Sequence, residues 1–125
     1  MLNASAAISA LVNAGSAREA LDDGQVHVPH LIDSEVASGL RRQVMDGDLA
    51  PDDGWLALDT WRHLGVTRYP VYALLDRVWQ LRENLTAYDA SYVALAEALN
   101  CSLVTADRRI GRAPGLRCPV TVVSR

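Results

Sequence analysis

The hydrophobic pattern of this chain alternates between short apolar runs and longer stretches with apolar residues at every third or fourth position. The short runs predict strands, and they lie at 1–2, 26–28, 66–69, 101–105 and 120–123. The longer stretches predict helices, and they cover 4–13, a short segment from Ser16, 31–45, 51–64, 71–82 and 86–99. A loop is expected over 110–117, where glycine and proline interrupt the pattern.

This order of elements predicts an α/β fold for one domain over residues 1–125. Strands that are short, apolar and separated by helices favour a central, mostly parallel sheet covered by helices on both faces, a three-layer sandwich. In such a sheet, ligands bind beyond the carboxyl ends of the strands. The three tryptophans, Trp55, Trp61 and Trp79, fall on apolar helical faces and are expected in the core.

The basic residues restrict the chemistry. All 12 lysine and arginine positions are arginine, so a Walker lysine, a Schiff-base lysine and a lysine general base are excluded. A receiver domain needs a lysine beside its carboxylates and is excluded for the same reason. Because the formal net charge is −3, a nucleic-acid contact must come from a local group of arginines.

The remaining composition is that of an ordinary globular protein. No apolar run is long enough to cross a bilayer and no basic, then apolar leader opens the chain, so a soluble cytoplasmic protein is expected. Cys101 and Cys118 fit no metal-finger spacing and precede strand-like runs, so two buried thiols are expected. A disulfide between them would need adjacent strand starts and an oxidising compartment.

Three carboxylates and one amide fall where strands end or helices begin. Asp107 and Asn3 follow strands, and Glu35 and Asp89 lie near helix starts. These positions direct all four side chains to one rim of the predicted sheet. Two carboxylates about 4 Å apart repel by roughly 4 kcal/mol at an effective dielectric near 20. A fold therefore keeps three of them together only if a cation neutralises them or one takes a proton.

The chemistry of such a cluster favours a metal nuclease. Carboxylate oxygens suit Mg²⁺ or Mn²⁺, which hold a few acids together with water and substrate phosphate. A metal of this kind activates water, polarises phosphorus and stabilises the leaving oxygen, so phosphodiester hydrolysis is the best-supported reaction.

Each acid also has an ordinary structural interpretation. Asp89 and Thr86 resemble a capping box, and Asp107 could cap the turn that follows it. Glu35 could pair with Arg42, and Asp33 is expected on the surface. No acid alone indicates a function, and the hypothesis depends on their convergence.

The chain resembles PIN-domain proteins, and in particular the VapC-type ribonuclease toxins of bacterial toxin–antitoxin pairs. The resemblance covers nearly the whole chain and is clearest in the blocks VPHLIDSEV at 28–36, YDASYVALA at 88–96 and LVTADRR at 103–109. It implies a PIN-like fold and an endoribonuclease that uses Mg²⁺ or Mn²⁺ held by Glu35, Asp89 and Asp107. It further implies a homodimer and a small antitoxin that inserts a segment into the acidic groove.

The first block departs from the family pattern, because Asn3-Ala4-Ser5 stands where the family has Asp-x-Ser. An amide oxygen carries no charge and is a weaker ligand for a hard cation, so we expect Asn3 to hold the metal imperfectly. Three interpretations remain open: a deliberate change that tames a toxin, a naturally attenuated nuclease, or a catalytically weak or inactive module that binds antitoxin or RNA. Ser5 and Thr105 are expected to support the metal ligands, and Ser5 could instead cap the first helix.

Arginines and histidines offer further candidates. Arg108, Arg109 and Arg112 follow Asp107 and could bind RNA phosphates or an antitoxin, or form a solvated basic loop. An alternative enzyme would use His27, His30 and His63 for acid–base cleavage of RNA without a metal.

Overall fold

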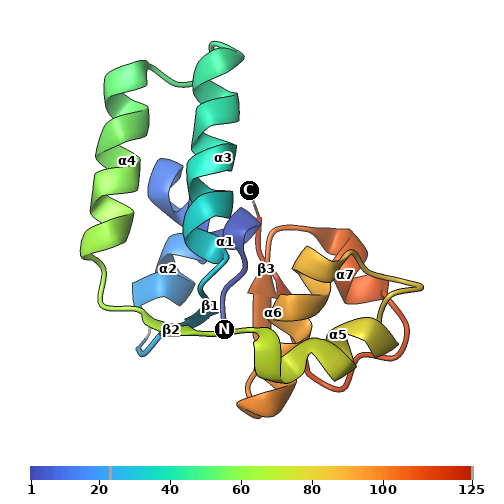
Figure 1. Cartoon of the computed structure of the whole chain (residues 1–125). Coiled ribbons are helices and arrows are strands. Elements are labelled where there is room, and N and C mark those ends of the chain that lie inside the picture. The colour runs from blue at the N-terminus through green and yellow to red at the C-terminus, as the bar shows by residue number, and fades with distance from the viewer. Residues whose placement is uncertain (23, 125) are drawn as a thin grey trace.

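The computed structural model describes residues 1–22 and 24–124. Its helices are α1 Ala4–Val12, α2 Ser16–Asp22, α3 Ile32–Met45, α4 Pro51–His63, α5 Leu75–Gln80, α6 Ala87–Ala98 and α7 Arg108–Arg112, with the 3-10 turn η1 Tyr72–Leu74. Its strands are β1 His27–Pro29, β2 Thr67–Tyr69, β3 Leu103–Thr105 and β4 Val120–Val122. β1 pairs with β2 and β3 with β4, both in parallel, so the prediction of short parallel strands is confirmed. Helices α1–α4 lie to one side of the strands and α5–α7 to the other (Figure 1).

The start of the chain extends the β3–β4 pair. Leu2 forms a parallel bridge with Val104. The Val104 N–H donates to the Met1 carbonyl at 2.9 Å, and the Asn3 N–H donates to the Val104 carbonyl at 3.0 Å. This pairing places Asn3 at the carboxyl end of a very short strand, beside the end of β3, where Thr105 lies.

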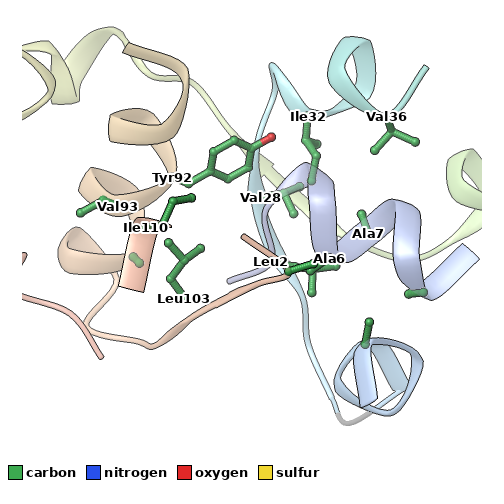
Figure 2. Close-up of a cluster of buried hydrophobic side chains, with 14 of the residues drawn as sticks. Leu2, Ala6, Ala7, Val28, Ile32, Val36, Tyr92, Val93, Leu103 and Ile110 are labelled. Atoms are coloured by element: carbon green, nitrogen blue, oxygen red, sulfur yellow. The ribbon is translucent and has the colours of Figure 1, made fainter. Parts of the chain in front are cut away.

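The core joins both groups of helices through the strands. Leu2, Val28 and Leu103 contribute strand side chains that are at most 2 % exposed, and Figure 2 shows them between apolar residues of α1, α3 and α6. Gly39 of α3 lies against Ile8 of α1, where an added Cβ would meet the Ile8 Cδ1 atom. A larger residue at position 39 would therefore require the Ile8 side chain to move, and α1 packs directly against α3.

Two predicted elements differ in the structure. The single helix expected over 71–82 is divided into η1 and α5. The loop expected over 110–117 is wrong at its start, because α7 extends to Arg112. The Asp107 side chain caps α7 by accepting from the Arg109 N–H at 2.9 Å, and Ile110 is 1 % exposed. Capping and burial of one side chain suffice for this short helix. No helix in the described residues is long and apolar enough to span a membrane.

The tryptophan prediction is correct for Trp61 and wrong for the other two. Trp61 is 1 % exposed, whereas Trp55 is 58 % and Trp79 67 % exposed. Helix α4 buries Ala57 and Trp61 on one face, and α5 buries Val78. Each helix has a broader apolar face than its neighbouring elements cover. Trp55 and Trp79 lie on the uncovered part and remain at the surface.

Candidate active site

Three acidic side chains approach the rim at the end of β3 from three different elements. Glu35 lies in the first turn of α3, Asp89 in the first turn of α6, and Asp107 at the N-cap of α7. Their charges act on one another, since Asp89 raises the pKa of Glu35 and Asp107 raises the pKa of Asp89. Across residues 1–22 and 24–124, no group of three or more His, Cys, Asp and Glu side chains could hold a metal ion as it stands. The acids are thus coupled by charge, and side chains must rotate before they can share one ion.

Glu35 is fixed by a tyrosine hydroxyl. The Tyr92 hydroxyl donates to Glu35 Oε1 at 2.5 Å. Burial raises the pKa of the Glu35 carboxyl, the hydrogen bond from Tyr92 opposes that shift, and the Asp89 charge adds to it. Burial also raises the pKa of Tyr92, with Glu35 adding to the shift, and a backbone hydrogen bond from Ala4 lowers it. One hydroxyl therefore links α6, α3 and the start of α1.

Asp89 combines a helix cap with a perturbed carboxyl. Its backbone N–H donates to the Thr86 Oγ1 atom at 3.1 Å, so the predicted cap is present. Burial raises the pKa of its carboxyl most, and the Asp107 charge raises it further, while Thr86 and Arg109 lower it. Since the Thr86 oxygen accepts from the backbone N–H of Asp89, this contact does not require an ionised side chain.

Asp107 caps α7 and holds an arginine. Its Oδ1 accepts from the Arg109 N–H at 2.9 Å and from Arg109 Nε at 3.1 Å, and its Oδ2 accepts from Arg109 Nη2 at 2.8 Å. The Arg109 side chain is 88 % exposed. Exposed ion pairs contribute little free energy, so a divalent cation can displace the guanidinium from this carboxylate. Arg108 and Arg112 are exposed on the same short helix.

Asn3 is buried, and both ends of its amide are hydrogen-bonded. Its Oδ1 caps α1 by accepting from the Ala6 N–H at 3.2 Å, and it also accepts from Ser5 Oγ at 2.8 Å. Its Nδ2 donates to Thr105 Oγ1 at 2.7 Å. The Thr105 and Ser5 hydroxyl oxygens are 3.3 Å apart. With Thr105 donating to Ser5, the three side chains form a closed ring of hydrogen bonds.

This ring holds the backbone that carries Asp107. The Thr105 hydroxyl oxygen accepts from the Asp107 N–H at 2.9 Å, and the Ser5 hydroxyl oxygen accepts from the Ala106 N–H at 3.0 Å. The alternative that Ser5 caps the first helix is wrong, because Ser5 lies within α1 and the cap oxygen belongs to Asn3. In this arrangement Asn3 acts as a neutral link between α1 and β3.

Asp33 was expected on the surface, yet it joins three elements. Its Oδ2 accepts from Arg68 Nε at 2.7 Å, and its Oδ1 accepts from Arg68 Nη2 at 2.9 Å and from Trp61 Nε1 at 2.8 Å. The hydrogen bond from Arg68 lowers the pKa of Asp33. This network links α3 to β2 and α4, which indicates a structural role for Asp33.

The histidines take other partners. His27 Nδ1 lies 2.8 Å from the Tyr69 hydroxyl, between β1 and β2. His63 Nδ1 lies 2.7 Å from the Asp59 carbonyl, at the end of α4. His30 is exposed and follows β1. These placements put His27 and His63 on structural contacts rather than beside the acids.

Tyr92 is the residue of the rim that sequence reasoning missed. It lies three positions after Asp89, so both face the same side of α6. A tyrosine on an otherwise apolar helix face, next to an acid at this spacing, was the available signal, because a buried hydroxyl requires a polar partner.

We expect Tyr92→Phe to lower the free energy of unfolding by about 1–2 kcal/mol, because Glu35 loses a donor in a half-buried position. Thermal denaturation measures this change. Tyr72→Phe is the matched control, since Tyr72 is 77 % exposed and should change little. Equal effects of the two substitutions would show that the Glu35 contact contributes nothing.

Known proteins resemble this chain over its length. The family model of the PIN domain matches residues 1–116. The chain is 58% identical to Ribonuclease VapC9 of Mycobacterium tuberculosis over 125 residues, covering 100% of this chain and 98% of that protein. It is 40% identical to Ribonuclease VapC1 of the same species, covering 98% of this chain and 96% of that protein. PAE2754 from Pyrobaculum aerophilum shares the fold in its crystal structure, with a TM-score of 0.71 at 21% identity, over 95% of this chain and 80% of that chain.

Proposed function

This chain belongs to the PIN domain family, and we propose that it is a VapC-type, metal-dependent endoribonuclease that acts as the toxin of a toxin–antitoxin pair. Cleavage of RNA is supported by the relatives, which are named as ribonucleases of the VapC type. The observation that carries the proposal is the position of Asp89 between two other acids, since its charge acts on Glu35 and the charge of Asp107 acts on it. We take the cytoplasm as its place of action.

The donor chemistry fits Mg²⁺ or Mn²⁺. Carboxylate oxygens are the ligands that these hard cations prefer. Burial raises the pKa values of Glu35 and Asp89, the charge of a neighbouring acid adds to each shift, and a cation would stabilise both ionised forms. Asp89, Asp107 and Glu35 would hold the ion once their side chains had rotated toward it. Asn3 could offer its amide oxygen only by weakening its bonds to Ser5 and Ala6.

The chain's own residues would position the substrate. When bound, the metal would supply an activated water for attack on phosphorus, leaving a 5′-phosphate and a 3′-hydroxyl. Arg109, once released from Asp107, can bind a backbone phosphate of the RNA, and the exposed Arg108 and Arg112 extend that contact. Thr105 and Ser5 hold the backbone on which Asp107 stands.

A groove beside Glu35 suits the antitoxin. It has a volume of about 500 Å³ and lies between α1 and α3. Apolar Ile8 and Val12 line it together with the acids Glu35, Asp46 and Asp48 and one arginine, Arg42, so its charged lining is acidic on balance. An amphipathic segment that carries arginine matches this mixture of apolar and acidic surface, so we assign this groove to a small cognate antitoxin.

The proposed homodimer would use exposed apolar side chains. Two groups are available: Met45, Trp55 and Leu56 on α3 and α4, and Tyr72, Leu75 and Trp79 on η1 and α5. Surface aromatic residues of this size are typical of protein interfaces.

A second candidate function follows from the state of Asn3. Both the oxygen and the nitrogen of the Asn3 amide are hydrogen-bonded within the protein. Asn3 would then provide no ligand to the metal, which would be left with three carboxylates. The chain would then be a catalytically weak or inactive module that binds antitoxin or RNA.

A cleavage assay with total cellular RNA tests the proposal. We expect slow cleavage in Mg²⁺ or Mn²⁺, complete loss in EDTA, and recovery when the metal is restored in excess, because the carboxylates alone cannot activate water. Mapping of fragment ends should give 5′-phosphates. Cleavage that persists in EDTA would favour the histidine mechanism, and binding of RNA without cleavage in either metal would favour the module.

A further inference from the structure

The two cysteines lie at the starts of neighbouring parallel strands. In the β3–β4 register, Leu103 is the partner of Val120 and Thr105 of Val122. Cys101 and Cys118 each stand two positions before the first of these pairs. The pairing begins close to them, because the Leu103 N–H donates to the Pro119 carbonyl at 2.9 Å. Cys101 and Cys118 therefore stand at the same end of the β3–β4 pair, just outside its hydrogen-bonded residues, where the Cys101 N–H donates to the Ala96 carbonyl at 3.0 Å.

This register suits a disulfide. Neighbouring strands are about 4.7–4.9 Å apart, and disulfides form across Cα separations of about 4.4–6.8 Å. Side chains alternate between the faces of a strand, so residues two positions before a register pair share that pair's face. The two thiols are thus expected on the same side of β3 and β4.

Both thiols can be reached from solvent. Each is free and partly exposed, and both line a hollow of about 160 Å³ together with Glu97 and Arg117. Hydrogen bonds fix the position of Glu97 in this hollow. Arg77 donates from Nε to Glu97 Oε1 at 2.7 Å and from Nη2 to Glu97 Oε2 at 3.1 Å, and the Arg117 N–H donates to Glu97 Oε2 at 2.7 Å. Burial raises the pKa of the Cys118 thiol, and the charges of Glu97 and Cys101 raise it further. The two thiols thus share one small hollow with the same charged neighbours.

We propose that Cys101 and Cys118 form a dithiol site that a small-molecule disulfide oxidises to an intramolecular disulfide joining β3 to β4. One cysteine, as the thiolate, attacks a sulfur of the small disulfide, breaks its S–S bond and releases one small thiol. The second cysteine then attacks the mixed disulfide and releases the other small thiol. Two protein S–H bonds are lost, one protein S–S bond forms, and the two protons end on the released thiols.

The disulfide would close the segment 101–118, which contains β3, the turn at Asp107 and α7. It would also hold β4, whose neighbour Val123 donates from its N–H to the Thr105 carbonyl at 2.8 Å. The physical consequence is a more stable pairing of β3 and β4, because the unfolded chain loses freedom when the loop is closed. This inference does not depend on the proposed nuclease activity.

The test uses the full chain and glutathione disulfide. We expect the folded protein to lose two hydrogen atoms by intact mass, to lose both alkylatable thiols and to regain them in dithiothreitol. The oxidised form should melt roughly 10 °C above the reduced form. Two free thiols in excess glutathione disulfide, glutathione adducts on both cysteines, or an unchanged melting temperature would each overturn the proposal.

A double variant, Cys101→Ser with Ser38→Cys, is the matched control. It keeps the number of thiols but moves one of them to an exposed position on α3, outside the hollow that Cys118 lines. We expect this variant to accumulate glutathione adducts instead of the intramolecular bond. Formation of an intramolecular bond at the rate of the unmodified chain would contradict the argument from the placement of Cys101 beside Cys118.

Discussion

The Asn3→Asp variant is expected to cleave RNA about 10- to 100-fold faster than this chain at limiting Mg²⁺. The substitution keeps the size of the side chain and adds a charged oxygen at the rim, where a hard cation gains both a ligand and a neutralising charge. Residual activity of the unmodified chain would rest on Glu35, Asp89 and Asp107 alone.

The ring around Asn3 can accept this change. An aspartate oxygen can keep the bonds from Ser5 Oγ and the Ala6 N–H that Asn3 Oδ1 accepts now. The Nδ2 group at present donates to Thr105 Oγ1 at 2.7 Å. In the variant the Thr105 hydroxyl would rotate and donate to the second carboxylate oxygen. Aspartate is also as good an N-cap as asparagine, so α1 keeps its cap.

The stability of this variant should depend on metal. Asn3 is only 4 % exposed, and a carboxylate in its place would stand near the other acids without a countercharge. In EDTA we expect the free energy of unfolding to fall by about 1–3 kcal/mol. Added Mg²⁺ should restore it and raise the melting temperature more than in the unmodified chain, because ligands that bind the native state stabilise it.

The measurements are RNA cleavage across a Mg²⁺ titration and thermal denaturation with and without EDTA. Asn84→Asp is the matched control, because Asn84 is exposed in the loop before α6 and the substitution adds the same charge. If Asn3→Asp cleaves RNA no faster than this control at any metal concentration, the side chain at position 3 is not a ligand of a metal site.

Sequence patterns predicted those parts of the molecule that depend on local order. The strand before Asp107 and the helix start at Asp89 follow from apolar runs and turn residues, and the structure has both. It also brings Asp89 within range of the charges of Glu35 and Asp107. Their role as metal ligands stays a prediction.

The contacts that the sequence did not reveal join distant positions. The Tyr92–Glu35 bond spans 57 residues and the Asn3–Thr105 bond spans 102. Periodicity shows which face of a helix is apolar, but not whether another element covers it, which is why Trp79 was misplaced. Side-chain partners at the rim, such as Arg109 on Asp107, depend on rotamers that no spacing rule specifies.

Asp89→Asn is expected to reduce metal-dependent cleavage by at least about 100-fold, because it removes a charged oxygen ligand from the centre of the acid group. In contrast to this loss of activity, stability in EDTA should hold or rise. The Thr86 cap is retained, since its donor is the backbone N–H of residue 89. The substitution removes a carboxyl that burial and Asp107 destabilise in its ionised form.

The raised pKa of Asp89 determines how the stability of the unmodified chain depends on pH. The pKa of Asp89 is raised in the folded protein above its ordinary value of 3.8, so the native state binds the proton more tightly than the unfolded state. The stability that this proton provides is full below pH 3.8 and is lost as the pH rises through the raised pKa. Asp33 and Glu97 have lowered pKa values and act in the opposite direction. Both are present in the variant, so they cancel in the difference. Glu35 loses the part of its raised pKa that Asp89 causes, which changes stability in the same direction as the loss of Asp89 itself.

Unfolding free energies of the two proteins should therefore separate as the pH rises above 3.8 in EDTA, with Asp89→Asn the more stable at neutral pH. Mg²⁺ should then stabilise the unmodified chain more than the variant, because only the former keeps the full acid group. Asp53→Asn is the matched control, since it removes the same charge from the exposed first turn of α4. A large loss of stability in Asp89→Asn at every pH would mean that its carboxylate serves the helix cap, and the rim would then hold two candidate ligands rather than three.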